Sequence, residues 1–222
     1  MRKAVSSFLL PTFFLSFVGT AQAASVAEVF TGEMLGKNQR YFESIAGIPR
    51  ESNGNNHEFM VQGCNITASI DAGKVTSLRL EVTPKCQADL NSFISTYAPA
   101  PGKPLTIGSF DDSSGGGLRY SADCLTMCGN SHDPSVYALW EGPHAVNWMQ
   151  VLLEVTLSSD EAIAASDTWR TEIQKAKGED FVVDTAFNCK PEFEASAKKA
   201  FEKVAVTAVT IGTGLVSPGC AQ

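Results

Sequence analysis

Residues 59–82 read FMVQGCNITASIDAGKVTSLRLEV, and this stretch decides how the first part of the chain folds. Its first half alternates apolar and polar residues, which is typical of a strand buried on one face. The apolar positions are Cys64, Ile66, Ala68 and Ile70. The Asp-Ala-Gly sequence at 71–73 fits a three-residue hairpin loop whose glycine supplies a positive φ. That loop length predicts a return strand with Ile66 opposite Leu78 on the buried face.

The segments around this hairpin complete a first unit over residues 24–98. Apolar residues at helical spacing predict a helix over 26–48, which a Gly-Ile-Pro sequence ends, and a polar loop follows over 51–56. A further helix is predicted over 87–97. Three prolines make residues 99–104 a stiff linker, which we expect to divide this helix-hairpin-helix unit from the rest of the chain.

A second unit, over residues 105–222, is centred on another hairpin. Its strands are predicted over 136–140 and 148–157, and the latter has a strictly alternating apolar face that we assign to the core. The residues of that face are Met149, Val151, Leu153, Val155 and Leu157. Before the hairpin, the sequence predicts a short strand over 105–107 and a flexible tract over 111–117, which is rich in glycine and serine.

Two helices are predicted after the second hairpin. A Ser-x-x-Glu capping box opens a helix over 158–177, and Pro191 begins the other. A short strand is expected over 181–183. The glycine-rich residues 210–222 are expected to be ordered mainly by Cys220. The sequence therefore predicts a disulfide-stabilised α+β protein of two hairpin-centred units with packed helices.

Residues 1–23 have the three parts of a secretory signal peptide. A basic Met-Arg-Lys start precedes an apolar stretch, and Ala21-Gln22-Ala23 forms a cleavage site. The chain carries 17 Lys and Arg against 24 Asp and Glu, and cleavage would remove two basic residues and no acidic one. The apolar stretch is too short to span a membrane, and no later segment is long enough. We therefore expect an acidic periplasmic or secreted protein, with neither membrane insertion nor nucleic-acid binding.

The six cysteines all follow the predicted cleavage site. An even number of cysteines behind a signal peptide indicates disulfides, because the compartments outside the cytosol are oxidising. Many pairings are possible, but the clustering of the cysteines favours three local bridges. These are Cys64–Cys86, Cys124–Cys128 and Cys189–Cys220. The first of them requires the chain to turn back at Pro84.

A cluster of metal-ligand types occupies residues 124–132. Cys124, Met127, Cys128 and His132 combine soft sulfur with imidazole, which suits Cu(I). The C-x₃-C spacing with a nearby histidine resembles that of periplasmic copper-delivery proteins of the Sco type, although turns rather than a helix follow it here. Copper binding or thiol redox chemistry at this motif is the alternative function. We prefer a loop-closing disulfide, with no metal site and no cofactor.

Signatures of catalysis are otherwise weak. His57, His132 and His144 lack a metal-ligand spacing, and no G-x-S-x-G elbow supports a serine nucleophile. The pair Asp111-Asp112 falls in the tract that we expect to be flexible, and residues 115–117 are followed by no Lys-Ser or Lys-Thr, so they form no phosphate loop. We therefore expect no enzyme and assign no catalytic residue.

Aromatic residues gather around the second hairpin. Trp140 and Trp148 flank its turn, and Phe110, Tyr120 and Tyr137 are nearby in sequence. The alternation places Trp148 on the strand face away from the core. If no helix covers that face, exposed aromatic side chains would mark a binding surface. We prefer the alternative in which the helix over 158–177 or the C-terminal helix covers it.

Residues 34–82 resemble one unit of the outer-membrane-assembly lipoproteins of the SmpA/OmlA type and of the β-lactamase-inhibitor-protein-like fold. The shared features are a helix ending in Gly-Ile-Pro at 47–49, a polar loop, and a hairpin whose turn is Ala-Gly-Lys at 72–74. The resemblance implies a non-catalytic periplasmic module that binds protein partners. The residue directly after the cleavage site is Ala24 rather than a cysteine that could carry a lipid, and residues from Leu105 onward match nothing in these families.

Taken together, the sequence favours an exported, non-enzymatic binding or interaction module of the cell envelope. Its expected partner is another envelope protein. The sequence fixes neither the identity of that partner nor the oligomeric state.

Overall fold

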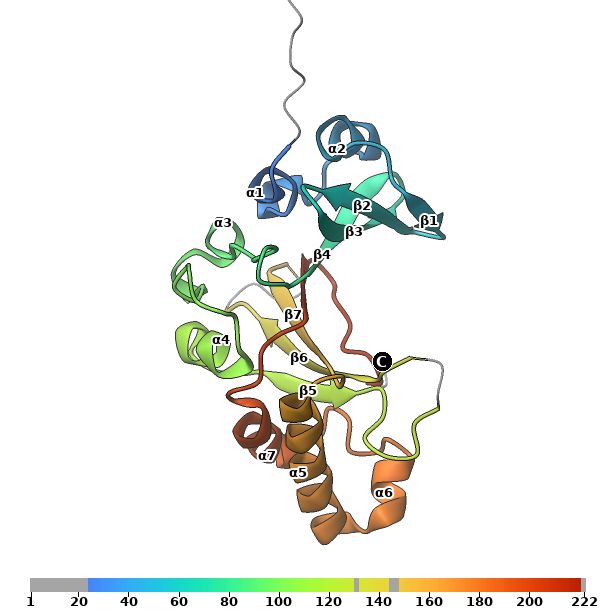
Figure 1. Cartoon of the computed structure of the whole chain (residues 1–222), viewed down its shortest axis with the longest axis vertical. Coiled ribbons are helices and arrows are strands. Elements are labelled where there is room, and N and C mark those ends of the chain that lie inside the picture. Colours follow the sequence, from blue (N-terminus) through green and yellow to red (C-terminus); the bar gives the residue numbers. More distant parts are fainter. Residues whose placement is uncertain (1–23, 130–131, 144–147, 221–222) are drawn as a thin grey trace, which may run out of the picture.

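The computed structural model describes residues 24–129, 132–143 and 148–220, which form an antiparallel sheet with packed helices (Figure 1). Its eight strands lie in the order β1-β2-β3-β4-β8-β7-β6-β5. They are β1 (Glu51–Asn53), β2 (Asn56–Val61), β3 (Cys64–Asp71), β4 (Lys74–Glu81), β5 (Arg119–Ala122), β6 (Ser135–Glu141), β7 (Gln150–Thr156) and β8 (Ala208–Gly212). The predicted signal peptide lies outside the described residues.

The helices of the described residues are mostly short. They are α1 (Val26–Val29), η1 (Gly32–Met34), α2 (Gln39–Ala46), α3 (Asn91–Ile94), η2 (Ser95–Tyr97), α4 (Ile107–Ser114), α5 (Asp160–Lys177), α6 (Glu179–Val183) and α7 (Pro191–Phe201). With the sheet and three disulfides, they confirm the disulfide-stabilised α+β class.

A continuous apolar row crosses the sheet and forms its core face. Successive cross-strand partners in this row are Phe59, Ile66, Leu80, Val209, Leu153, Ala138 and Tyr120. Each is at most 3% exposed. Helices cover this face: Phe42 of α2 packs edge-on against Phe59, with ring centroids 5.0 Å apart, and Trp169 of α5 packs against Tyr120. The helices and the apolar row therefore bury each other.

Strand β8 joins the two hairpin-containing parts of the chain. It pairs with β4 on one side and with β7 on the other, so the sheet runs without a break across the division expected at residues 99–104. Residues 210–222, expected to be ordered mainly by Cys220, instead begin inside this central strand. Val209 and Ile211 are buried on its core face, so side-chain packing as well as strand pairing holds β8 in place.

The helix expected over residues 26–48 is broken between α1 and α2. Gly36 has a φ of 78°, and its N–H donates to the Val75 carbonyl of β4 at 2.7 Å, so the chain runs alongside the sheet there. The Asn38 side chain then caps α2 by accepting the Tyr41 N–H at 2.9 Å. The prediction of a polar loop over 51–56 was also wrong, because these residues contain β1 and the turn into β2.

The strand expected over residues 59–70 is two strands. Gln62 and Gly63 have φ values of 51° and 84°, and they form the tight turn between β2 and β3. The next hairpin has a two-residue loop rather than three, and a β-bulge between Ser69 and Ile70 shifts the register by one further residue, so Ile66 pairs with Leu80 rather than with Leu78. The prediction of the register was therefore wrong by two residues. Because side chains alternate with a period of two, the predicted buried face is still the buried one.

Three local predictions in the rest of the chain were wrong. Residues 105–107 lead into α4 rather than a strand, because Thr106 forms a capping box with Ser109. Residues 181–183 lie in α6, whose first turn carries two acidic residues that suit a helix start. The helix expected over 87–97 is reduced to α3 and η2.

The second hairpin and its following helices agree with the sequence. Strands β6 and β7 pair along their length, and Val151, Leu153 and Val155 of β7 are fully buried. Helix α5 is capped by Ser159, one residue later than expected, and α7 begins at Pro191. Among the described residues, we find no helix that is both long enough and apolar enough to cross a membrane.

Candidate functional site

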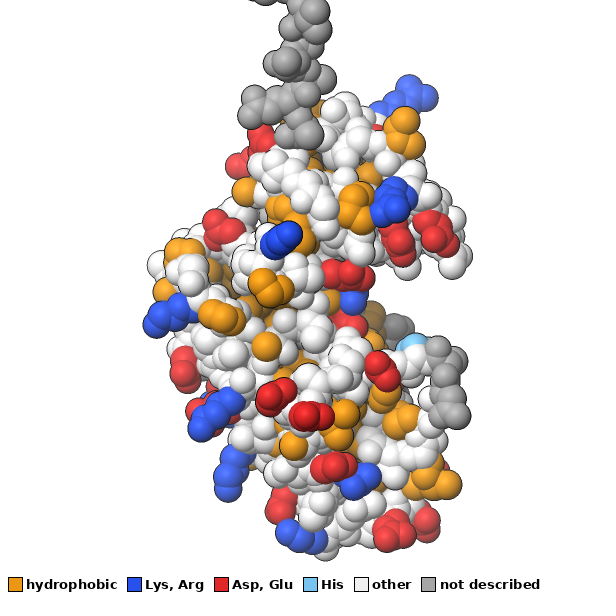
Figure 2. Space-filling model, in the orientation of Figure 1, with side chains coloured by type: hydrophobic (Ala, Val, Ile, Leu, Met, Phe, Trp, Pro, Cys, Tyr) orange, Lys and Arg blue, Asp and Glu red, His pale blue; other side chains and the backbone are white. Residues whose placement is uncertain are grey.

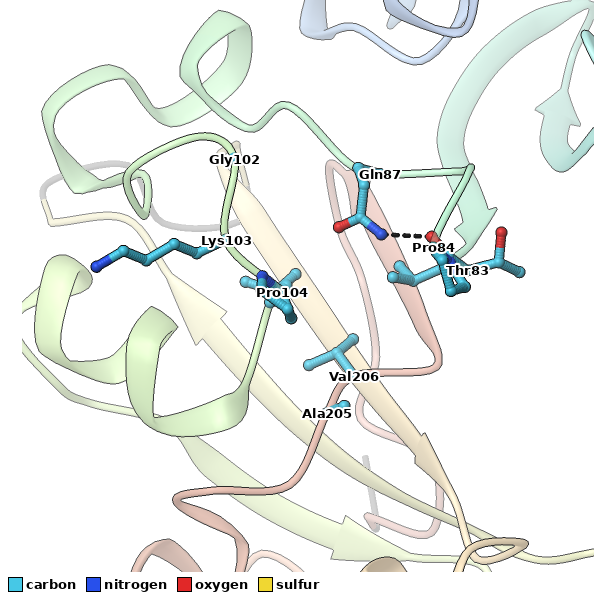
Figure 3. Close-up of a pocket in the computed structure, with 10 residues that line it drawn as sticks. Thr83, Pro84, Gln87, Gly102, Lys103, Pro104, Ala205 and Val206 are labelled. Atoms are coloured by element: carbon cyan, nitrogen blue, oxygen red, sulfur yellow. Dashed lines mark hydrogen bonds between the residues drawn. The ribbon is translucent and has the colours of Figure 1, made fainter.

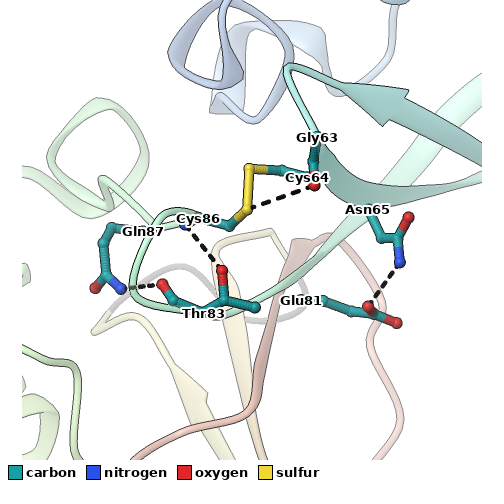
Figure 4. The surroundings of a disulfide bond; sticks show 7 residues. All are labelled: Gly63, Cys64, Asn65, Glu81, Thr83, Cys86 and Gln87. Carbon is teal, nitrogen blue, oxygen red and sulfur yellow. Dashed lines mark hydrogen bonds between the residues drawn. A yellow bond between two sulfur atoms is a disulfide. The ribbon is translucent and has the colours of Figure 1, made fainter.

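All six cysteines form disulfides, in the pairing that their clustering favours. Cys64, at the start of β3, is joined to Cys86, with Cα atoms 5.6 Å apart (Figure 4). The chain reverses at Pro84, where the Cys86 N–H donates to Thr83 Oγ1 at 3.1 Å. The other disulfides are Cys124–Cys128 and Cys189–Cys220. The three bridges hold loops that lie outside the helices and strands.

The candidate copper ligands do not form a thiolate site. Cys124 and Cys128 are oxidised to a disulfide, so neither sulfur carries the negative charge that a metal ligand needs. Met127 is 85% exposed, and His132 is also exposed. Among the described residues, no group of three or more His, Cys, Asp and Glu side chains is arranged to hold a metal ion.

The remaining candidate residues are separate from one another. The His57 ring bonds to the Ser52 hydroxyl at 2.8 Å on the neighbouring strand, and His144 lies outside the described residues. Asp111 was expected in a flexible tract, but it is 3% exposed on α4 and pairs with Lys198 of α7. The helix explains the difference: it holds residues 107–114, and only the three glycines after it form the turn into β5.

The aromatic residues near the second hairpin divide into buried and exposed groups. Trp140 is buried and packs against Phe110 of α4 and Tyr97 of η2. Trp148 is 77% exposed, so the expectation that a helix covers it was wrong. It stands two residues before β7 begins, outside the paired strands.

An apolar groove of about 410 Å³ opens where β4 separates from β8 (Figure 3). Its walls come from the end of β4, the proline-rich segment and the approach to β8. They include Val82, Pro84, Pro104, Leu105 and Val206, with the Gln87 amide at one side. The Lys103 side chain points away from the groove, so the groove itself offers no charge to a ligand (Figure 3).

The sheet face opposite the helices is polar. Its central row of cross-strand partners is Glu51, Glu58, Thr67, Arg79, Thr210, Leu152, Leu139 and Arg119. We call this surface the open face; it consists of this row together with Met60, Asn65, Glu81, Glu154, Tyr137 and the adjacent Asp123. Because side chains alternate along each strand, these residues cannot reach the helix layer that covers the core row.

Charged groups on the open face form a network centred on Arg79. Its guanidinium donates to Glu154 from both Nε and Nη2 at 2.9 Å, and its Nη1 lies 3.5 Å from Glu81. The Ser135 hydroxyl donates to the other oxygen of Glu154 at 3.0 Å. The Asn65 amide donates to Glu81 at 2.8 Å (Figure 4). These bonds fix side chains from strands that are far apart in the sequence.

Tyr137 and Asp123 extend the network toward the edge of the sheet. The Tyr137 hydroxyl donates to Asp123 Oδ2 at 3.1 Å, and the Ser135 N–H donates to the same oxygen. Burial raises the pKa of Tyr137 well above its ordinary value, and the negative charges of Asp123 and Glu154 raise it further. The phenol therefore stays protonated and acts as a donor, rather than as a base.

The C-terminal segment covers one end of the open face. The Leu215 N–H donates to the Gln150 side chain at 2.6 Å, and the Ser217 and Ser121 hydroxyls bond at 2.8 Å. Beneath this segment, Leu139 is only 2% exposed. The other end, from β1 to the Arg79 network, has no such cover among the described residues. Figure 2 shows the molecule hollowed below the region of β1 and β2, with acidic and basic side chains in the hollow.

Sequence reasoning did not single out the residues of this network. Their signal is the presence of Arg79, Glu81 and Glu154 at the polar positions of otherwise apolar strands. That pattern shows that one face of each strand is not core, but it does not show that β4 and β7 share a neighbour. The pairing of both strands with β8 is what brings these side chains together.

Comparisons with protein-family models, with curated proteins and with solved structures gave no match. The resemblance of residues 34–82 to the outer-membrane-assembly and β-lactamase-inhibitor-protein-like families therefore stays a prediction.

Proposed function

We propose that this chain is an exported, non-enzymatic binding protein of the cell envelope, and that the open face is where its protein partner docks. The observation that carries the proposal is the asymmetry of the sheet. Helices cover the core row, whereas the opposite side chains from β1 to the Arg79 network have no covering layer among the described residues.

The open face suits recognition because its side chains are already ordered. Arg79, Glu154 and Glu81 hold one another through charge-assisted hydrogen bonds, and the strands that carry them are paired on both sides. A partner that meets such a surface restricts few additional side-chain rotations, so less of the binding free energy is lost to ordering.

Export is the second part of the proposal. Three disulfides support an oxidising compartment, and the sequence supplies a predicted signal peptide with its cleavage site after Ala23. The periplasm is the compartment that we propose. The intact mass of protein recovered from that compartment should correspond to a chain beginning at Ala24, and a mass that retains residues 1–23 would contradict it.

The docking surface can be tested with a photo-crosslinking residue at two exposed apolar positions. Met60 lies on the open face at 37% exposed, and Ile163 lies on α5 at 45% exposed. We expect one envelope protein to crosslink through position 60 and not through position 163, and untagged protein to compete for it. The purified partner should then bind the purified chain. Crosslinking through position 163 alone, or at both positions equally, would contradict the proposal.

A further inference from the structure

We infer that the Cys124–Cys128 bridge is a site of thiol–disulfide exchange with a dithiol reductant, and that its opening releases the Asp123 end of the network on the open face. This inference goes beyond the proposed function and does not depend on where a partner docks. The observations that carry it are the partial exposure of both cysteines, the few contacts that tie their loop to the rest of the chain, and the position of Asp123 beside the bridge.

The first observation is access to the bridge. A disulfide is reduced by a thiolate that attacks one of its sulfurs, so the rate depends on whether the sulfur can be reached. Cys64 and Cys86 are only 3% and 4% exposed, which protects that bridge from a reductant. Cys124 and Cys128 are both half-buried, and Met127, which lies between them in the sequence, is 85% exposed. The outer side of this loop is therefore within reach of another protein.

The second observation is how weakly the loop is tied to the fold. Residues 125–129 make no backbone hydrogen bond to any residue that the structure describes, and Leu125 is the only one of them that is buried. The bridge is therefore the main restraint on Cys128. Once it opens, the fold holds the two thiols together less firmly than it holds the other two cysteine pairs. Their effective concentration, which drives reclosure of the bridge, is correspondingly lower.

The remaining bridge is half-buried as well, but hydrogen bonds hold it from both sides. The Cys189 N–H donates to the Tyr120 carbonyl at 3.0 Å. Three residues before Cys220, the Ser217 hydroxyl bonds to the Ser121 hydroxyl at 2.8 Å. Both contacts are anchored on β5, so they would keep the two thiols adjacent after reduction and favour reclosure. Accessibility alone therefore does not make a bridge exchangeable, and Cys189–Cys220 is structural.

The reaction is a two-electron exchange between the bridge and a dithiol reductant. A thiolate of the reductant attacks one sulfur of the bridge, forms a mixed disulfide, and displaces the other cysteine as a thiolate, which takes up a proton. The second thiol of the reductant loses its proton and attacks the reductant's own sulfur in the mixed disulfide, which releases the remaining cysteine. The reductant ends as a disulfide, and the protein gains two thiols.

Asp123 connects the bridge to the open face. This residue directly precedes Cys124, and its carboxylate accepts the Tyr137 hydroxyl and the Ser135 N–H, each at 3.1 Å. The Asp123 N–H donates to the Ser135 carbonyl at 3.0 Å. Ser135 also bonds to Glu154 through its hydroxyl, so it joins Asp123 to the rest of the network. Opening the bridge frees the chain directly after Asp123 and should weaken these bonds.

The experiment equilibrates the mature protein with rising ratios of reduced to oxidised dithiothreitol. Acid quenching, alkylation and peptide mapping then give the reduced fraction of each bridge. We expect Cys124–Cys128 to be half reduced at a ratio at least about tenfold lower than either of the other bridges requires. Far-UV circular dichroism should not change at that ratio, because the bridge lies outside the helices and strands. Opening of another bridge at the same ratio or a lower one would overturn the inference, and so would loss of the dichroism signal when only Cys124–Cys128 is open.

Hydrogen exchange measured by NMR tests the connection to Asp123. The Ser135 amide should exchange severalfold faster in Cys124→Ser/Cys128→Ser than in the parent, whereas the Leu153 amide, in the middle of β7, should be unchanged and serves as the control. The parent should show the same change at the ratio that opens only this bridge, and the change should reverse on re-oxidation. Unchanged exchange at Ser135, or an equal increase at Leu153, would overturn the connection.

Discussion

Arg79 on β4 reaches across β8 to bind Glu154 on β7, with two of its nitrogens 2.9 Å from one carboxylate oxygen. The two residues are 75 positions apart in the sequence, and the strand between them comes from the C-terminal end of the chain. This contact therefore forms only when β8 is in place, and it reports on the assembly of the complete sheet.

A double-mutant cycle measures this coupling. Arg79→Met should cost about 1–3 kcal/mol, because it leaves the Glu154 side chain, which is only 16% exposed, without its cation. In the cycle formed by Arg79→Met, Glu154→Gln and their combination, urea unfolding should give a coupling energy of about 1 kcal/mol. The exposed pair Glu172–Lys175 is the control, for which we expect a clearly smaller coupling energy because solvent screens both charges. Equal coupling energies for the two pairs would show that the network adds nothing beyond a surface contact.

Sequence periodicity predicted what each strand buries but not what each strand pairs with. The alternation around Leu153 and in residues 64–70 correctly identified the core faces, because burial depends on the side chains of the strand itself. The pairing of β8 with both β4 and β7 could not be predicted in this way. Residues 208–212 are short, and their sequence carries no turn signal that links them to either partner.

Turns and helix starts were the other source of error. The positive φ of Gln62 splits one predicted strand into two, and glutamine gives little warning of such a turn. Thr106 and Ser109 form a reciprocal cap that begins α4, although the sequence there resembles a strand. The open face depends on the Gln62 turn in particular, since that turn determines the register of β2 against β3. It could be described only after the strands were placed.

Tyr120 provides a test of stability at alkaline pH. Burial raises its pKa well above 10.0, with smaller contributions from Asp111 and Glu194, and its hydroxyl has no hydrogen-bond partner among the described residues. The unfolded chain would ionise this phenol near its ordinary pKa, whereas the folded chain would not. Its contribution to stability is therefore complete below about pH 10 and is lost as pH rises through the raised pKa.

As pH rises above about 10, Tyr120→Phe should therefore lose less unfolding free energy than the parent does. At pH 7 the unfolding free energies of the variant and the parent should differ by less than about 1 kcal/mol. Chemical unfolding at several pH values measures both. Lys198, whose pKa is raised by its hydrogen bond and charge interaction with Asp111, acts in the same direction. Because Lys198 affects both proteins, the contribution of Tyr120 is measured by the difference in unfolding free energy between variant and parent at each pH. Tyr41→Phe, at an exposed position on α2, is the matched control, and an equal benefit from it would contradict the assignment to Tyr120.

The three disulfides should differ in what they contribute to stability. They close loops whose ends are 4, 22 and 31 positions apart for Cys124–Cys128, Cys64–Cys86 and Cys189–Cys220 respectively. Loop-closure entropy then predicts losses of about 2, about 3 and nearly 4 kcal/mol when each pair is replaced by alanine. Denaturant unfolding of the three double variants gives the order. A larger loss for Cys124–Cys128 than for Cys189–Cys220 would contradict it.

The oxidation state of Cys124 and Cys128 decides between the binding module and the copper alternative. A disulfide sulfur is a poor ligand for Cu(I), so the structure predicts no copper uptake unless a reductant first opens that bridge. Protein purified from the periplasm should show no alkylation in its intact mass before reduction and six alkylated cysteines afterwards. A metal count on the same sample should find no stoichiometric copper. Two thiols that are alkylated without reduction and map to Cys124 and Cys128, with about one copper per chain that is lost in Cys124→Ser, would instead favour metal handling.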